Sequence, residues 1–210
     1  MGEHRLCKPR VAGSIPVTST IYIGESMRLD HIAYRVKNKE KTAKFFIDFM
    51  GYKKPENLQE GFDIQFEDGT WAKCLVLEPS EKISTLMPWR VFDLTALESR
   101  EHHLAPEIFI SDGSPGSIVE KWVDAKNGIG GIHHIAYQVD SVEKLMQEWK
   151  DRGFSDFATE NPLTCPGLVQ VFTNPLAHTG ILYEFIERST QGFCAENVKD
   201  LMKSTKNNKF

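Results

Sequence analysis

GIHHIAY, at residues 131–137, is the stretch that decides the fold, because a similar stretch, LDHIAY at residues 29–34, occurs earlier in the chain. Both stretches alternate apolar residues with short or polar ones, which is typical of β-strands. A glycine pair, Gly130 and Gly131, breaks the chain just before the second copy. Two copies of one strand in a single chain predict an internal repeat.

The residues after each copy have the same order of elements, a helical pattern and then several strand patterns. In the first half we expect strands at residues 27–36, 62–66, 71–77 and 107–110, and a helix at 40–50. In the second half we expect strands at 132–139, 168–172 and 180–187, a helix that Asp140 caps and that ends near residue 152, and helices at 118–123 and 193–202. This order predicts an α+β fold of paired βαβββ modules, with residues 27–112 as the first module, including an irregular insertion, and 113–210 as the second.

The first 26 residues differ from the rest of the chain, because they show neither a helical nor an alternating pattern. We expect a poorly ordered tail there, or an extension that a misassigned start site has added. The motif GSIP at residues 13–16 is what the T-loop of a transfer-RNA gene would encode if it were translated. In that case Met27 is the native first residue.

Composition limits the classes of partner. A net charge of −4 offers no broad basic surface, so we expect no nucleic acid as a main partner. No apolar run approaches the roughly 18 residues of a membrane helix, so we expect no membrane partner either. Four scattered cysteines without C-x-x-C spacing predict reduced thiols in a cytoplasmic protein. The sequence leaves open whether the chain forms a homodimer.

Three polar residues in apolar strands form a candidate metal site. Aligning the two copies makes His31 and His134 equivalent, and strand alternation then puts His133 on the opposite face. Glu184 lies in ILYEFI, residues 181–186, where a carboxylate without a partner would be expensive to bury. Two histidines and one carboxylate are the ligands of the facial triad in non-haem Fe(II) oxygenases. The competing interpretation is that each is an ordinary hydrogen-bonded core residue.

The repeated strands, the helices after them and Glu184 together resemble the vicinal-oxygen-chelate superfamily, the glyoxalase, bleomycin-resistance and dioxygenase group. The second half is more specifically similar to the catalytic domain of the 4-hydroxyphenylpyruvate dioxygenase family, through residues 117–123 (SIVEKWV), 131–134 (GIHH), 170–176 (QVFTNPL), 182–188 (LYEFIER) and 191–197 (QGFCAEN). The resemblance implies an open barrel around a metal site, with a C-terminal helix that covers it. It also implies an enzyme that uses Fe(II) and O₂ to oxidise a small molecule, an aryl or related α-keto acid.

Under this resemblance His31, His134 and Glu184 are the metal ligands, and no further catalytic residue is implied. The ion is Fe(II), or alternatively Co, Zn, Ni or Mn. The implied substrate-binding residues differ in part from those of the family, since His133 replaces a glutamine and Ser111 an asparagine. The full set is His133, Ser111, Gln170, Phe172, Phe193 and Asn197.

Two other functions remain open from the sequence. The chain also resembles the methylmalonyl-CoA epimerase family through residues 130–135 (GGIHHI) and 179–184 (TGILYE). That resemblance implies a metal-dependent isomerase, in which Glu107 is a possible fourth ligand and Glu60 a weak candidate base. A glyoxalase-like function would also be a metal-dependent isomerase. The third alternative is a metal-free protein of the same fold that binds a small molecule.

Overall fold

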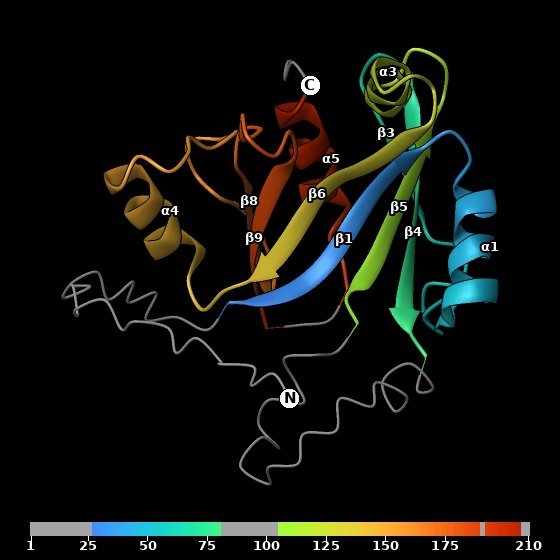
Figure 1. The fold of residues 1–210 in the computed structure, drawn as a ribbon, viewed down its shortest axis with the longest axis horizontal. Coiled ribbons are helices and arrows are strands. Elements are labelled where there is room, and N and C mark those ends of the chain that lie inside the picture. The colour runs from blue at the N-terminus through green and yellow to red at the C-terminus, as the bar shows by residue number, and fades with distance from the viewer. Residues whose placement is uncertain (1–26, 81–104, 190–191, 207–210) are drawn as a thin grey trace, which may run out of the picture.

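The computed structural model describes residues 27–80, 105–189 and 192–206; the expected tail at 1–26 lies outside these ranges. The described strands are β1 (Arg28–Val36), β2 (Tyr52–Lys53), β3 (Phe62–Gln65), β4 (Trp71–Pro79), β5 (Glu107–Gly113), β6 (Gly130–Gln138), β7 (Leu163–Cys165), β8 (Leu168–Phe172) and β9 (Leu182–Arg188). The described helices are α1 (Lys39–Met50), α3 (Ile118–Ala125), α4 (Val142–Asp151) and α5 (Ala195–Ser204). The strands form one mixed sheet in the order β2-β4-β5-β1-β6-β9-β8-β7, with β3 paired to β4 (Figure 1). The α+β fold of paired modules is thereby confirmed.

The helix ends follow from local chemistry. Helix α1 begins after Asn38, whose side chain accepts a hydrogen bond from the backbone N–H of Lys41, and it ends at Gly51 in the left-handed conformation. The predicted cap of α4 was wrong by one residue. Ser141, not Asp140, adopts the extended cap conformation and accepts from the N–H of Lys144. No described helix has the length and apolarity that a membrane span requires.

The sheet has apolar layers on both faces. Alternate residues of β1, such as Ile32 and Tyr34, pack with α1, and the second half packs its equivalent face against α4. The other face of β1 carries His31, Ala33 and Arg35, which line an interior cavity. The apolar residues that pack against α1 and α4 must lie on the outer face of the sheet. Their burial therefore fixes which residues of β1 and β6 face inward.

A local two-fold relation joins the two halves at the centre of the sheet. Strands β1 and β6 are antiparallel, and His31 pairs with Ala136 while His134 pairs with Ala33. Each central strand has a parallel neighbour: Ala33 pairs with Phe109 on β5, and Ala136 pairs with Glu184 on β9. Phe109 is therefore the counterpart of Glu184 in the first half.

The expectation that His133 faces away from His134 was wrong. The register between β1 and β6 shifts where Ala33 pairs with His134 and Tyr34 pairs with Ile132, so His133 is an extra residue on β6. Such a bulge interrupts strand alternation and places two consecutive side chains toward one side. A second shift makes Asp30 the extra residue on β1, one position before His31. The two bulges thus precede the two equivalent histidines.

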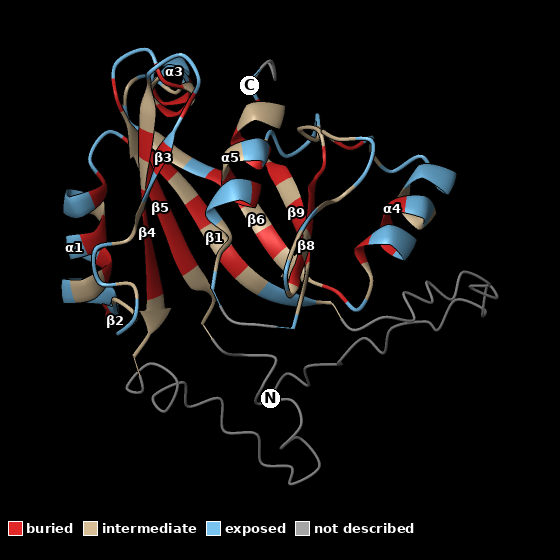
Figure 2. Ribbon diagram, turned by 180° about the vertical axis from the view of Figure 1, so that it is seen from behind, coloured by how far each residue is buried: buried red, intermediate tan, exposed pale blue. Residues whose placement is uncertain are grey.

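Helix α5 covers the inward face of the sheet. It contacts β3 near one end of the sheet and β7 and β8 near the other, so it bridges the open side of the curved sheet (Figure 2). Val198 and Met202 pack into the interior cluster of the first half, and Leu201 packs against Phe172 and Leu182 of the second. The predicted helix at 193–202 forms two residues later than expected, and the implied covering role is confirmed.

Candidate metal centre

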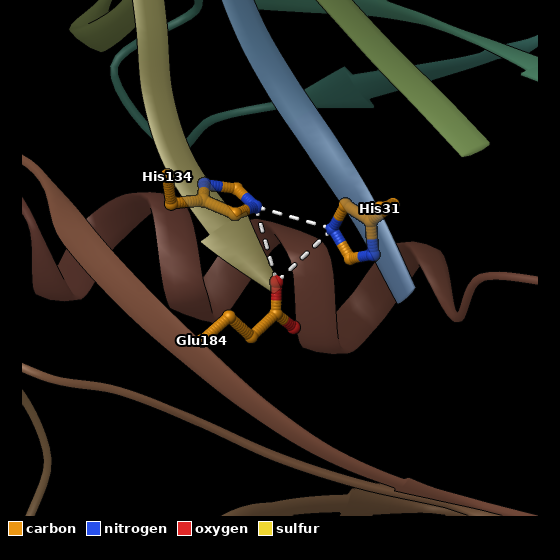
Figure 3. Close-up of side chains that lie close together, drawn as sticks. All are labelled: His31, His134 and Glu184. Carbon is orange, nitrogen blue, oxygen red and sulfur yellow. Dashed lines mark hydrogen bonds and ion pairs between the residues drawn. The ribbon is translucent and has the colours of Figure 1, made fainter. Parts of the chain in front are cut away.

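The side chains of His31, His134 and Glu184 meet inside the sheet, each from a different strand (Figure 3). The two Nε2 atoms of the histidines lie 3.2 Å apart. Oε2 of Glu184 lies 3.2 Å from Nε2 of His31 and 3.0 Å from Nε2 of His134. All three residues are buried. In the described part of the chain they form the one group of three or more His, Cys, Asp or Glu residues close enough to hold an ion.

The spacing of these three atoms fits a divalent metal. Ligand atoms at roughly 2.1 Å from an ion, at right angles to one another, stand about 3.0 Å apart. The three measured edges, 3.0 to 3.2 Å, are close to that value. Imidazole and carboxylate together suit first-row divalent metals such as iron, manganese, cobalt, nickel and zinc. The triad can therefore bind a divalent metal through one face of its coordination shell.

Glu184 is held in place by a chain of side-chain amides. Gln170 on β8 donates a hydrogen bond from Nε2 to Oε1 of Glu184, at 2.7 Å. Asn197 on α5 donates from Nδ2 to Oε1 of Gln170, at 3.1 Å. These hydrogen bonds occupy Oε1 of Glu184 and leave Oε2 directed at the two histidines. The resemblance assigns Gln170 and Asn197 to the substrate, but in the structure Gln170 contacts the carboxylate ligand and Asn197 contacts Gln170.

The residues at the two bulges support the two histidines. Oδ1 of Asp30 accepts a hydrogen bond from Nδ1 of His31, at 2.7 Å, and also one from Arg188, at 2.8 Å. Nδ1 of His133 lies 2.8 Å from Nδ1 of His134. Partners of this kind on the second ring nitrogen fix the ring orientation and leave Nε2 free for a metal. The two halves therefore support their histidines from equivalent positions with different chemistry.

The charges in the metal-free triad are unevenly shared. Burial alone lowers the pKa of His31, but the carboxylates of Glu184 and Asp30 outweigh it and raise that pKa to about 9. Burial lowers the pKa of His134 to about 4, although a hydrogen bond that His134 can donate to Glu184 opposes this shift. Burial also disfavours the charged form of Glu184, but the charge of His31 and hydrogen bonds from both histidines hold the pKa of Glu184 well below its usual range. At neutral pH an imidazolium at His31 therefore pairs with the carboxylate, beside a neutral His134.

Metal affinity is expected to rise about tenfold per pH unit between roughly pH 6 and 9. A metal requires the free lone pair of His31, and that nitrogen is protonated below a pKa of about 9, so binding releases one proton. His134 and Glu184 are already deprotonated over this range. Competition with a chromophoric chelator at pH 6.5 and 7.5 measures the slope. A dissociation constant that is equal at both pH values would contradict this charge assignment. Asp30 helps to raise the pKa of His31, so in Asp30→Asn the rise in affinity should level off at a lower pH.

A cavity of about 30 Å³ adjoins the triad, and most of the residues that the resemblance assigns to the substrate line it. Phe193 packs edge-on against His31, with ring centroids 5.1 Å apart, and Phe172 packs against His134 at 4.6 Å. Ser111 and His133 also line this cavity, and the Ser111 hydroxyl donates to the backbone carbonyl of Tyr34. The aromatic walls give the site a largely apolar surface around a few polar groups, as in many small-molecule sites.

Glu107, the candidate fourth ligand, is not part of the cluster. It lies beside His31 in the register of β5 and β1, but its side chain lines a second, larger cavity of about 360 Å³. Phe193 borders both cavities. In the first half, the position that corresponds to Glu184 is occupied by Phe109. The ring centroid of Phe109 lies 6.3 Å from that of His31. Glu60, the weak candidate base, is exposed.

Sequence reasoning missed several residues of the site, among them Asp30, Arg35 and Phe109. Alternation from His31 could have identified Arg35, because residues 31, 33 and 35 of one strand share a face. The counterpart of Glu184 could not be found in this way, because it depends on the pairing register between strands that lie far apart in the sequence. Asp30 is visible only once the bulge that turns it inward is known.

Comparisons with known proteins agree with this architecture. Residues 30–163 match the family model described as Glyoxalase/Bleomycin resistance protein/Dioxygenase superfamily. A search of curated proteins finds no match. Similar solved structures include a methylmalonyl-CoA epimerase, at 20% identity over 77% of this chain and 95% of that one, with a TM-score of 0.53.

Two further structures resemble the chain. A hypothetical protein from Bacillus halodurans C-125 is 25% identical over 80% of this chain and 99% of its own, with a TM-score of 0.54. A triple mutant of 4-hydroxymandelate synthase from Streptomyces coelicolor is 17% identical over 86% of this chain, with a TM-score of 0.64. The match covers 53% of the synthase, so this chain spans about half of its length. The similarities to the epimerase and the synthase establish a common fold.

Proposed function

The chain belongs to the glyoxalase/bleomycin resistance protein/dioxygenase superfamily, and from that premise we propose that it is an Fe(II)-dependent dioxygenase. Its substrate in this proposal is an aryl or related α-keto acid. One observation carries the choice of reaction: Phe109 occupies the position that corresponds to Glu184, so the described residues of the two halves offer three candidate ligands and not four. A three-ligand face leaves positions open for two substrate oxygens and for O₂.

The protein's own residues have clear tasks in this reaction. His31, His134 and Glu184 would hold the ion, and a bound Fe(II) would supply the redox chemistry that O₂ requires. Asp30, His133 and Gln170 orient the three ligands through the hydrogen bonds described above. The rings of Phe109, Phe172 and Phe193 and the apolar face of α5 exclude water from the reacting atoms. Each task needs only contacts that exist before any ligand binds.

The isomerase alternative has less support. It calls for a fourth ligand, and the register puts an aromatic ring there, while Glu107 lines the other cavity. It also calls for a base, and the sequence candidate Glu60 is exposed. The fold shared with a methylmalonyl-CoA epimerase does not separate the two reactions, because the synthase structure shares that fold as well.

The proposal is tested with protein that has been loaded anaerobically with Fe(II). We expect O₂ uptake with phenylpyruvate or another α-keto acid, matched one to one by CO₂ release, and no uptake by protein loaded with Zn(II). The Zn(II) form is the matched control because its ion has no redox chemistry. Absence of O₂ uptake across the panel, together with deuterium exchange at the α-carbon of an acyl thioester, would instead favour the isomerase.

A further inference from the structure

Arg35 is a buried cation inside the cavity of the metal centre. It lies on β1, four residues after His31 and on the same face, with the small side chain of Ala33 between them. Only 3% of Arg35 is exposed to solvent. Gly130 at the start of β6 allows this close packing, because a Cβ there would stand 2.1 Å from the carbonyl oxygen of Arg35. The guanidinium therefore belongs to the interior and not to the surface.

Within the described residues the Arg35 guanidinium makes one side-chain hydrogen bond. Nη2 donates to Oγ1 of Thr205, just after α5, at the long distance of 3.3 Å. Among the described residues no carboxylate lies within ion-pair distance of Arg35. The nearby Cys74 is no substitute, because burial raises the pKa of its thiol and keeps it neutral. A guanidinium has five N–H donors, and a buried one without an anion is costly to maintain.

Among the described residues that line the cavity with Arg35, Glu184 is the one that carries a negative charge. His31 also lines the cavity, as an imidazolium without metal and as a neutral ligand once an ion is bound. The remaining side chains of the lining are neutral: Ser111 from β5, His133 from β6, Gln170 and Phe172 from β8, and apolar residues of α5. Burial lowers the pKa of Arg35 to about 9, which leaves it charged at neutral pH. With a divalent ion bound, the positive charges of the ion and Arg35 exceed the single negative charge of Glu184. The cavity then favours a ligand with more than one negative charge.

We propose that Arg35 is an anion-binding residue of the substrate site, and that the substrate is an α-keto acid with a second carboxylate at its far end. The inference rests on the proposed function for the end of the substrate that binds the metal. Arg35 takes the other end, since its planar fork matches a carboxylate with two parallel hydrogen bonds. Such a site discriminates strongly against an analogue that lacks the anion, because the buried guanidinium then stays unpaired.

The test compares ligands that differ only in the terminal carboxylate. Two pairs serve, 2-oxoglutarate against 2-oxovalerate, and 4-carboxyphenylpyruvate against 4-methylphenylpyruvate. Calorimetry on protein loaded with Zn(II) measures binding without turnover. In at least one pair the carboxylate member should bind about tenfold tighter or better, and Arg35→Met should remove that preference while metal content stays the same. Equal binding within both pairs, or a preference that survives in Arg35→Met, would overturn the proposal.

Stability separates a ligand-binding role from a structural one. If Arg35 serves a ligand, Arg35→Met should leave the melting temperature of the metal-free protein equal or higher, because an unpaired buried charge is replaced by an apolar side chain of similar length. A lower melting temperature, or a variant that fails to fold, would assign Arg35 to the scaffold and contradict the proposal. The comparison of ligand pairs on the native chain needs no variant.

A metal-free arm separates failure of this inference from failure of the proposed function. Benzoate is the probe, since it carries one carboxylate on an aromatic ring and cannot chelate through a keto group. We expect benzoate to bind the metal-free protein and to lose that binding in Arg35→Met. If benzoate binds in this way but no α-keto acid binds the loaded protein, the anion site stands and the proposed reaction falls. If α-keto acids bind the loaded protein but benzoate binding is unaffected by Arg35→Met, the proposed reaction stands and the anion site at Arg35 falls.

Discussion

Replacing His134 by alanine is expected to abolish metal binding, with a loss of about 1,000-fold or more in affinity. His134 contributes one corner of the ligand triangle, and its Nε2 lies 3.0 Å from the Glu184 oxygen and 3.2 Å from Nε2 of His31. The neighbouring His133 reaches the His134 ring on the side away from Nε2, with 2.8 Å between the two Nδ1 atoms. Replacing His133 by alanine should therefore lower the metal affinity by about 10- to 100-fold and leave a saturable site.

This pair of variants is informative because the two residues are adjacent and both are buried. Titration of each metal-free protein with Co(II) or Zn(II) gives the two affinities under one set of conditions. His133→Gln is the matched control, since its side-chain oxygen can accept the Nδ1–H of His134 and should restore most of the affinity. A loss in His133→Ala as large as in His134→Ala would mean that the ligand and its support have been assigned in reverse.

Replacing Phe109 by glutamate is expected to retain the metal and eliminate O₂ uptake. The register places Phe109 opposite Ala33 as Glu184 is placed opposite Ala136, so a carboxylate there can reach the ion as a fourth ligand. Four protein ligands leave too few positions for a chelating substrate together with O₂. Without metal, the new carboxylate would be buried among aromatic rings, and the free energy of unfolding should fall by roughly 2 kcal/mol or more.

Metal content, O₂ uptake and metal-free stability are measured on the same preparations. Phe109→Leu is the control, because it keeps an apolar side chain at this position and should keep both the metal and the three-ligand face. A Phe109→Glu enzyme that consumes O₂ at the native rate would show that Phe109 is not the counterpart of Glu184. Loss of the metal in Phe109→Glu but not in Phe109→Leu would show that the new carboxylate displaces a ligand and does not add one.

The fold was predictable because it depends on patterns that are local or repeated. The two copies gave the module order, and their alignment made His31 and His134 equivalent. Glu184 stood out because both faces of its strand are apolar in the sequence. The resemblance to a known superfamily added the covering helix, which the structure places across the open side of the sheet.

The parts that escaped prediction depend on how strands are paired. The bulge that turns His133 inward is a shift in register between β1 and β6, and nothing in the local pattern of GIHHIAY marks it. Glu107, offered only as a possible fourth ligand, lies outside the cluster for a related reason, since the position opposite Ala33 belongs to a residue two places later on β5. Arg35 was overlooked because an arginine in a strand is more often at the surface, whereas this one is enclosed by α5 and β6.

The stoichiometry of Fe(II) binding tests the central claim most directly. Metal-free native protein titrated anaerobically should bind one Fe(II) per chain at a single saturable site, and Glu184→Ala should bind none at the same concentrations. Gln170→Ala is a suitable companion, because it leaves all three ligands in place and should weaken the site by about 10- to 100-fold without changing the stoichiometry. A native chain that binds no Fe(II), Co(II) or Zn(II) would contradict the account, and the buried triad would then be a hydrogen-bonded part of the core.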